Sequence, residues 1–120
     1  MKVSRKKILE NTSSYRDGLI ESLKNDPEEL ALYIQVTIED YEENGNIKPF
    51  LVALRNIVDV KGGISQLAEQ TKLNRQSLYK TLSLDGNPRF DTLITILKAI
   101  GVKMSFKPEI SINSKQENAA

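Results

Sequence analysis

Helix start and stop signals divide this chain so often that only short helices fit between them. Asp26-Pro27-Glu28-Glu29 is a strong start, because the aspartate can accept hydrogen bonds from free backbone donors and proline suits the first helical position. Asn44-Gly45-Asn46, Gly62-Gly63 and Gly101 are stops. A chain of 120 residues has room for one small hydrophobic core. These signals predict a single domain of short helices packed around that core.

Apolar residues recur at helical spacing between these boundaries. The expected helices span residues 15–24, where Gly18 interrupts the stripe, and 27–43, 46–61, 65–71, 74–82 and 90–100. The expected core-facing residues are Leu19, Ile20 and Leu23, then Leu30, Ile34, Thr37, Ile38 and Tyr41, then Phe50, Leu51, Leu54, Ile57 and Val58, and last Phe90, Leu93, Ile94, Leu97 and Ile100. Residues 102–106 alternate apolar and polar, which allows a short C-terminal β-strand. The predicted fold class is all-α, a five-helix single domain preceded by an acidic N-terminal arm.

The net charge of +1 hides a strong division of charge along the chain. Residues 1–14 carry +3 and are expected to form a basic flexible tail, whereas residues 15–44 carry −7 and form the acidic helical arm. Residues 45–107 carry +6 and form the main domain, and residues 108–120 carry −1 and form a second flexible tail. A basic compact region suits a polyanion, and the acidic arm suits either a basic protein partner or simple intramolecular balance.

Cysteine and histidine are both absent. Their absence removes thiol nucleophiles, disulfides, the commonest general base and the commonest metal ligand. We therefore expect a protein that is not an enzyme and holds no metal or cofactor. No segment approaches the roughly 20 consecutive apolar residues of a membrane span, and no signal-type apolar core follows the basic N-terminus. The expectation is a soluble cytoplasmic protein with no membrane partner.

Two of the expected helices are short and lie only a few residues apart, in GGISQLAEQTKLNRQSLYKTLS. Ala68 is small where such helices must approach closely, and the buried contacts are assigned to Leu67, Leu73, Leu78 and Leu82. This is the pattern of a helix-turn-helix, whose second helix enters the major groove of DNA. The outward positions of that second helix are Gln76, Tyr79, Lys80 and Ser83, with Arg75 beside them.

The side chains at these outward positions suit the recognition of bases. Arginine or lysine can donate to guanine, and glutamine can pair with adenine, so the candidate base readers are Arg75, Gln76 and Lys80. The candidates for phosphate or groove-edge contacts are Ser65, Gln66, Asn74, Ser77, Tyr79 and Ser83. Any exposed helix can carry Arg, Gln and Lys, but the short helix before it, the flanking apolar helices and the local +6 charge favour DNA binding.

The stretches FLVALRNIVDVKGGISQLAEQTKLNRQSLYKTLS and DGNPRFDTLITILKAIGVKMS resemble one family in particular. From Tyr15 to Lys107 the chain is similar to the addiction-module antidote proteins, HigA-like antitoxins with a phage-repressor type helix-turn-helix. The resemblance implies a lambda-repressor-like fold. One departure is Lys72, which stands where the family usually has glycine in the turn, and a left-handed backbone there costs about 1 kcal/mol for a residue other than glycine.

The functional hypothesis that the resemblance implies is the antitoxin of a type II toxin-antitoxin module. Such a protein represses its own operon by binding operator DNA, usually as a dimer, and neutralises a small basic toxin that resembles the RelE and HigB messenger-RNA nucleases. Two alternatives stay open: a stand-alone phage-type transcriptional regulator, and a protein-interaction module that has lost DNA binding. For the dimer surface the candidates are residues 102–112, where two strands could pair, and an exposed part of the last helix.

Overall fold

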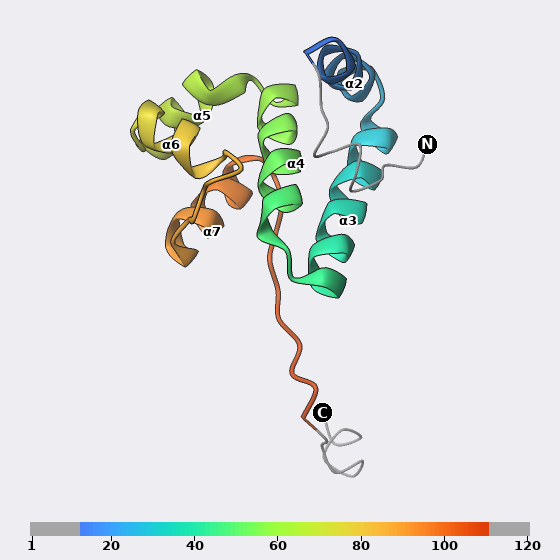
Figure 1. Cartoon of the computed structure of the whole chain (residues 1–120), viewed down its shortest axis with the longest axis vertical. Helices are drawn as coiled ribbons and strands as arrows, with labels where there is room; N and C mark the ends of the chain where they lie inside the picture. Colours follow the sequence, from blue (N-terminus) through green and yellow to red (C-terminus); the bar gives the residue numbers. More distant parts are fainter. Residues whose placement is uncertain (1–12, 111–120) are drawn as a thin grey trace.

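A computed structural model describes residues 13–110 as a bundle of six helices without a strand in that range. The helices are α2 (Ser13–Asn25), α3 (Pro27–Asn44), α4 (Ile47–Val60), α5 (Gly63–Thr71), α6 (Arg75–Thr81) and α7 (Phe90–Ala99) (Figure 1). The all-α prediction is confirmed. The expected tails fall largely outside the described residues.

The helix ends follow the local signals of the sequence. Asp26 accepts hydrogen bonds from the backbone N–H groups of Glu28 and Glu29, and Asn46 accepts one from that of Lys48. At the end of α7, Gly101 takes a left-handed backbone (φ 88°) and donates to the Lys98 carbonyl. The next N–H, of Val102, donates to the carbonyl of Leu97 at 2.8 Å. This pair of bonds is a Schellman motif, which needs the left-handed conformation that glycine adopts without strain.

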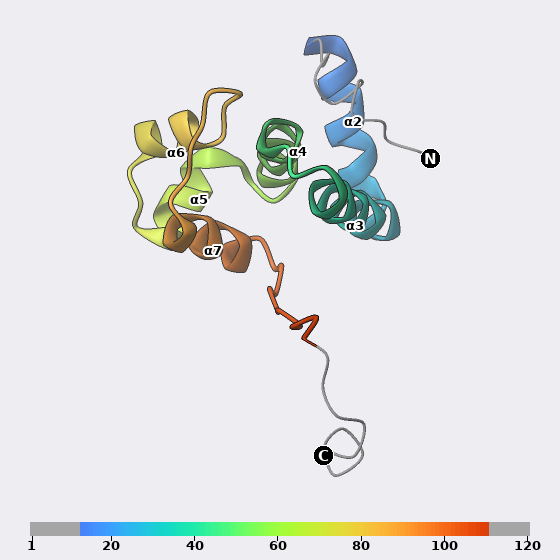
Figure 2. The same ribbon diagram turned by 60° about the horizontal axis from the view of Figure 1, so that its bottom comes forward.

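Helix α4 lies in the middle of the molecule. It packs against α2 and α3 on one side and α5 on the other, and α5 in turn packs against α6 and α7 (Figures 1 and 2). The predicted core face of α4 is confirmed, since Phe50, Leu51, Leu54, Ile57 and Val58 are all buried. Leu19 and Leu23 of α2 are buried in the same core. Six helices, including the two of the expected acidic arm, therefore share one core, in place of the five-helix domain with a separate arm that we expected.

The buried faces of α3 and α7 differ from the predicted ones. Phe90 was expected in the core but is 63% exposed, and the most buried residue of α7 is Ile96, at 0%. In α3 the most buried side chain is Tyr33, while Tyr41 lies at the rim against the ring of Phe50, with ring centroids 5.2 Å apart. Both helices carry apolar residues around more than one face, so periodicity alone does not determine which face the neighbouring helices cover.

The possible C-terminal strand is not formed. Residues 102–110 are extended but carry no strand or bridge within the described chain. An isolated extended segment has no neighbour to accept and donate its ladder of hydrogen bonds, so the alternating sequence pattern is not sufficient to make a strand.

Candidate nucleic-acid interface

The turn between α5 and α6 has the left-handed residue that the sequence placed at Lys72. This is the only residue other than glycine with positive φ in the described chain (φ 64°, ψ 19°), and its N–H donates to the carbonyl of Ala68 at 2.8 Å. The Thr71 hydroxyl donates to the carbonyl of Leu67 at 2.7 Å and accepts from the N–H of Leu73 at 3.3 Å. These bonds hold the turn at a fixed angle although lysine is strained in it.

Apolar side chains anchor both helices of this unit to the core. Leu67, Leu78 and Leu82 are buried as predicted, and Leu73 and Ala68 are partly buried against the same cluster. Asn74 begins α6, because its side-chain oxygen accepts from the N–H of Ser77 at 3.0 Å. The buried leucines thus determine which side of α6 is turned toward solvent.

The three candidate base readers, Arg75, Gln76 and Lys80, are all exposed. None makes a side-chain hydrogen bond or ion pair with the rest of the described chain. Gln76 and Lys80 are four residues apart, so they lie on one face of α6 about one turn from each other. The structure therefore presents two donor groups side by side with free ends, as contact with base edges requires.

The six candidates for phosphate or groove-edge contacts are placed differently. Ser65, Gln66, Asn74, Ser77 and Tyr79 are exposed, whereas Ser83 is partly buried. The hydroxyl of Ser83 donates to the carbonyl of Lys80 at 2.8 Å, and the side-chain oxygen of Asn74 is occupied by its cap. The carboxamide of Gln66 folds back over Gly62. Among the six, the side chains of Ser65, Ser77 and Tyr79 make no hydrogen bond within the described chain.

Arg55 is a residue of this site that the sequence did not reveal. Its guanidinium carbon lies 4.9 Å from the centroid of the Tyr79 ring, and its Nε lies 3.3 Å from a carboxylate oxygen of Asp59. This contact with Asp59 is a salt bridge without a hydrogen bond, because Arg55 Nε has no aligned acceptor. Arg55 and Tyr79 are 24 positions apart and belong to different helices, so no local signal could have paired them. The contact adds positive charge beside α6 and holds one face of the tyrosine ring.

A polar network connects this corner to the N-terminal helices. The guanidinium of Arg16, on α2, pairs with Asp59 and donates from Nε to the side-chain oxygen of Asn56 at 2.9 Å. The amide nitrogen of Asn56, which is fully buried, donates to the hydroxyl of Tyr33 at 3.0 Å. Burial raises the pKa of Tyr33, and the hydrogen bond from Asn56 partly opposes that rise. The buried side chains of Asn56 and Tyr33 both have hydrogen-bond partners, and these bonds join α2, α3 and α4 in one arrangement.

The loop after α6 contains the Asp-Gly-Asn-Pro stretch and turns back onto the end of that helix. A Cβ on Gly86 would lie 2.1 Å from the backbone carbonyl oxygen of Thr81, so only glycine fits there. Beyond the loop, Arg89 pairs with Asp91 at 3.2 Å, with both side chains largely exposed. Lys48, Lys61 and Lys98 are exposed as well. These residues stay candidates for additional phosphate contacts.

A metal site and a membrane-spanning helix are two other features that a chain of this kind could carry. Across residues 13–110 there is no group of three or more acidic, histidine or cysteine side chains that could hold a metal ion. Over the same range, no helix combines the length and apolar character needed to cross a membrane.

The chain is similar to known proteins over most of its length. Residues 17–108, which extend from α2 past α7, match a protein-family model described as "Probable addiction module antidote protein". An uncharacterized protein of Haemophilus influenzae is 34% identical over 76 residues, which cover 63% of this chain and 73% of that protein. No solved structure gives a significant match.

Proposed function

The chain belongs to the probable addiction module antidote protein family, and on that premise we propose that it is the antitoxin of a type II toxin-antitoxin module and represses its own operon. An antidote implies a toxin as its partner, and proteins of this kind are generally not enzymes. The proposed activity has two parts: sequence-specific binding of operator DNA by a dimer, and neutralisation of a small basic toxin that resembles RelE and HigB.

The observation that carries the DNA-binding part is the exposed face of α6. Gln76 and Lys80 project from the side of α6 opposite buried Leu78, and exposed Arg75 lies beside them at the start of the helix. With α5 packed against it and a tight turn between them, α6 corresponds to the recognition helix of a helix-turn-helix. Each well-aligned contact between such a side chain and a base contributes about 1–3 kcal/mol of discrimination.

The N-terminal half supports the toxin-binding part. Residues 15–44 carry nine acidic and two basic residues, and most of the acidic side chains of α3 are exposed, including Glu28, Glu42 and Glu43. A toxin that cleaves RNA must be positively charged where RNA binds, so an acidic surface would attract it and exclude other acidic proteins. In this proposal the toxin binds to the acidic surface of α2 and α3, and DNA binds to α6.

The DNA-binding part can be tested by fluorescence anisotropy over a series of salt concentrations. The probes are a duplex from upstream of the protein's own gene and a scrambled duplex. We expect the upstream duplex to bind more than about tenfold more tightly and both affinities to fall as salt rises. Arg75→Ala/Gln76→Ala should remove the preference between the duplexes.

A matched control variant also loses one positive charge and one amide, but at positions outside α6. Lys24→Ala/Gln35→Ala removes one exposed cation and one exposed amide from α2 and α3, and should leave the preference intact. Equal binding of wild-type protein to both duplexes would contradict a repressor and favour an interaction module that has lost DNA binding.

The toxin-binding part is tested with the product of a neighbouring gene. We expect a reading frame of about 100 residues with a basic product, as an electrostatic partner of the acidic arm requires. Its expression alone should arrest growth, and co-expression of this chain should restore it. If no such gene exists, or if the chain fails to restore growth, a stand-alone regulator is the better description.

A further inference from the structure

Residues 102–110 carry the sequence pattern of a strand with one apolar face. The even-numbered residues are all apolar and the odd-numbered ones all polar: Val102, Met104, Phe106, Pro108 and Ile110 alternate with Lys103, Ser105, Lys107 and Glu109. Because successive side chains of an extended segment point to opposite sides, these five apolar residues share one face. A surface loop does not require strict alternation over nine residues, so this pattern indicates a strand.

In a single chain this segment has no partner. After the N–H of Val102, no residue from 103 to 110 makes a hydrogen bond or ion pair within the described chain. Phe106 is 73% exposed and Ile110 is 75% exposed. Unpaired backbone groups beside exposed apolar side chains form an edge that can pair with another chain.

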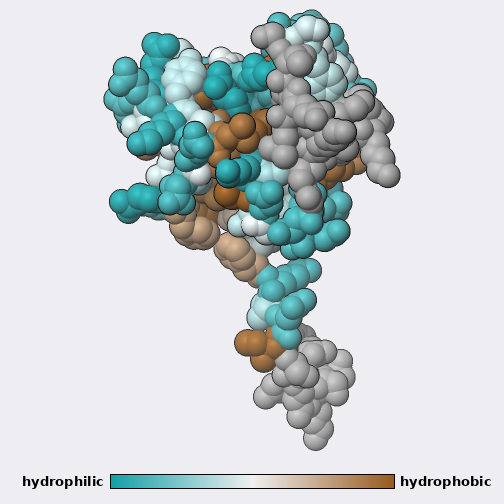
Figure 3. Space-filling model, in the orientation of Figure 1, coloured by the Kyte–Doolittle hydropathy of each residue, from teal (hydrophilic) through white to brown (hydrophobic). Residues whose placement is uncertain are grey.

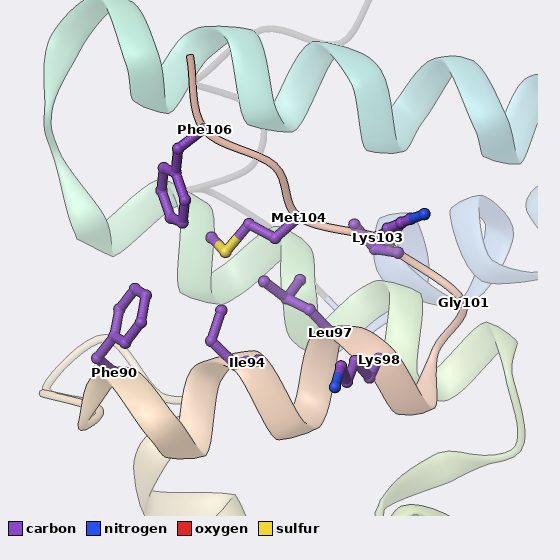
Figure 4. A pocket seen from close by; sticks show the side chains of 9 residues that line it. Phe90, Ile94, Leu97, Lys98, Gly101, Lys103, Met104 and Phe106 are labelled. Carbon is purple, nitrogen blue, oxygen red and sulfur yellow. The ribbon is translucent and has the colours of Figure 1, made fainter. Parts of the chain in front are cut away.

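The segment also leaves apolar space on both of its sides. A hollow of about 430 Å³ lies between it and α7, with Phe90, Ile94 and Leu97 in its wall (Figure 4). A second hollow, of about 360 Å³, lies between the segment and α3 and α4, where Tyr41 and Phe50 line it. Met104 and Phe106 point from the segment toward α7, and the Phe106 ring centroid is 6.3 Å from that of Phe90. Hydrophobic surface gathers where the segment leaves the body and recurs along it (Figure 3).

We propose that residues 102–110 pair antiparallel with the same residues of a second copy, in a register centred on Phe106, and that this ribbon is the dimer interface. The inference rests on the dimer in the proposed function and names its surface. In this register the apolar faces coincide: Val102 lies opposite Ile110 of the second copy, and Met104 lies opposite Pro108. The second copy's apolar side chains are then beside the two hollows, where they fill space that a single chain leaves open.

Charge supports the same register. Lys103 lies opposite Glu109 of the second copy, and the two-fold axis repeats this pair, so two cross-strand ion pairs form. A register centred on Ser105 would place Lys103 opposite Lys107, and one centred on Lys107 would place that lysine opposite itself. Like charges directly opposite each other destabilise a strand pair.

The remaining shifts are excluded by the side-chain pattern. A shift of pairing by one residue would put the apolar face of one strand beside the polar face of the other. A register centred on Pro108 would place Ser114 opposite Val102, which brings a polar residue to the apolar hollow. Only the Phe106-centred register pairs every apolar residue from 102 to 110 with an apolar residue of the same nine-residue segment.

The hydrogen-bond ladder of this register accommodates proline. Antiparallel pairs alternate between hydrogen-bonded and non-hydrogen-bonded positions. If the pair at Phe106 is non-hydrogen-bonded, Pro108 also occupies a non-hydrogen-bonded position, where its missing N–H would point away from the partner. The bonded positions are then 103, 105, 107 and 109, and each of these residues has an N–H.

The absence of cysteine from the chain allows a direct test by cross-linking the full-length protein without DNA. In a non-hydrogen-bonded antiparallel pair the opposing Cα atoms are about 4.5 Å apart, within the range of a disulfide. Phe106→Cys should therefore cross-link to its own copy under oxidised glutathione. Met104→Cys is the matched control, because its two copies would be about 13 Å apart along the ribbon, too far for a disulfide. We expect the Phe106 variant to cross-link at least about tenfold faster.

A charge exchange tests the interface without removing an apolar side chain. By sedimentation velocity at low salt, Lys103→Glu should weaken dimerisation roughly tenfold, and Lys103→Glu/Glu109→Lys should restore it, because the double change only reverses each cross-strand pair. Lys24→Glu, on α2, should have little effect.

The outcomes separate this inference from the proposed repressor. Equal or faster cross-linking of Met104→Cys or Pro108→Cys, or failure of the double charge variant to restore dimerisation, overturns the register. A dimer in which Phe106→Cys does not cross-link overturns this interface but leaves a dimeric repressor standing. Rapid Phe106 cross-linking with no preference for operator DNA would support the interface and contradict the repressor.

Discussion

Replacing Lys72 by glycine should stabilise the fold. Lys72 holds φ 64° in the turn between α5 and α6, where a residue with a Cβ is strained by about 1–2 kcal/mol. Glycine relieves that strain, but it also gives the unfolded chain more conformational freedom. That freedom lowers the free energy of unfolding by about 0.4–1 kcal/mol. The lysine side chain is exposed and makes no ion pair or hydrogen bond to described residues, so its loss removes no contact. The expected net gain in the free energy of unfolding is about 0.5–1 kcal/mol.

Thermal and urea unfolding measure this gain. For a domain of this size, the gain corresponds to a rise in Tm of about 2–6 °C. Lys72→Ala is the control for the lost charge, since alanine keeps the strain of a left-handed residue and should not stabilise. Lys72→Val should be less stable than Lys72→Ala, because a β-branched side chain is more hindered at positive φ. If Lys72→Ala stabilises as much as Lys72→Gly, the gain comes from charge and the strain argument is wrong.

Three further predictions concern the fold and are checked by urea unfolding. Tyr33→Phe should cost about 1–3 kcal/mol at pH 7, because the buried amide of Asn56 loses its acceptor. Burial raises the pKa of Tyr33, so the folded chain keeps a proton that the unfolded chain releases, and wild-type stability should fall as pH rises above about 10. An equally steep fall in the phenylalanine variant would refute this. Asn74→Ala should cost about 1 kcal/mol through loss of the α6 cap, and no loss would mean that the cap is dispensable. Gly86→Ala should cost about 1–3 kcal/mol through its clash with the end of α6, whereas Gly18→Ala, which meets nothing within 4 Å, should not destabilise.

The candidate site was predictable as far as it depends on local chemistry. Gln76 and Lys80 are exposed because Leu78, on the opposite side of the same short helix, is buried, and the helical spacing of these residues in the sequence predicts this. Arg75 is exposed at the first position of the helix. The left-handed residue at Lys72 was expected only from the family resemblance, because glycine usually occupies that turn position in the family. Arg55 was not predictable, because its contact with α6 depends on how α4 packs.

The sequence by itself determined where the helices begin and end. Asp26, Asn46, Asn74 and Gly101 satisfy or terminate backbone hydrogen bonds within a few residues of themselves, so their effect is the same whatever lies across the core.

Only the tertiary structure decided which faces are covered. Phe90 is exposed and Ile96 is buried, although both are apolar residues of α7, because the position of α5 selects one face of that helix. Tyr33 packs in the core, and Asn56, 23 positions away, donates to its hydroxyl and so offsets the cost of removing it from water. The alternation of residues 102–110 is encoded, yet a single chain forms no strand there, because the groups that would complete its hydrogen bonds must come from outside the segment. The sequence predicts hydrogen bonds between neighbouring residues, whereas burial and strand pairing depend on residues that are distant in the sequence or belong to another chain.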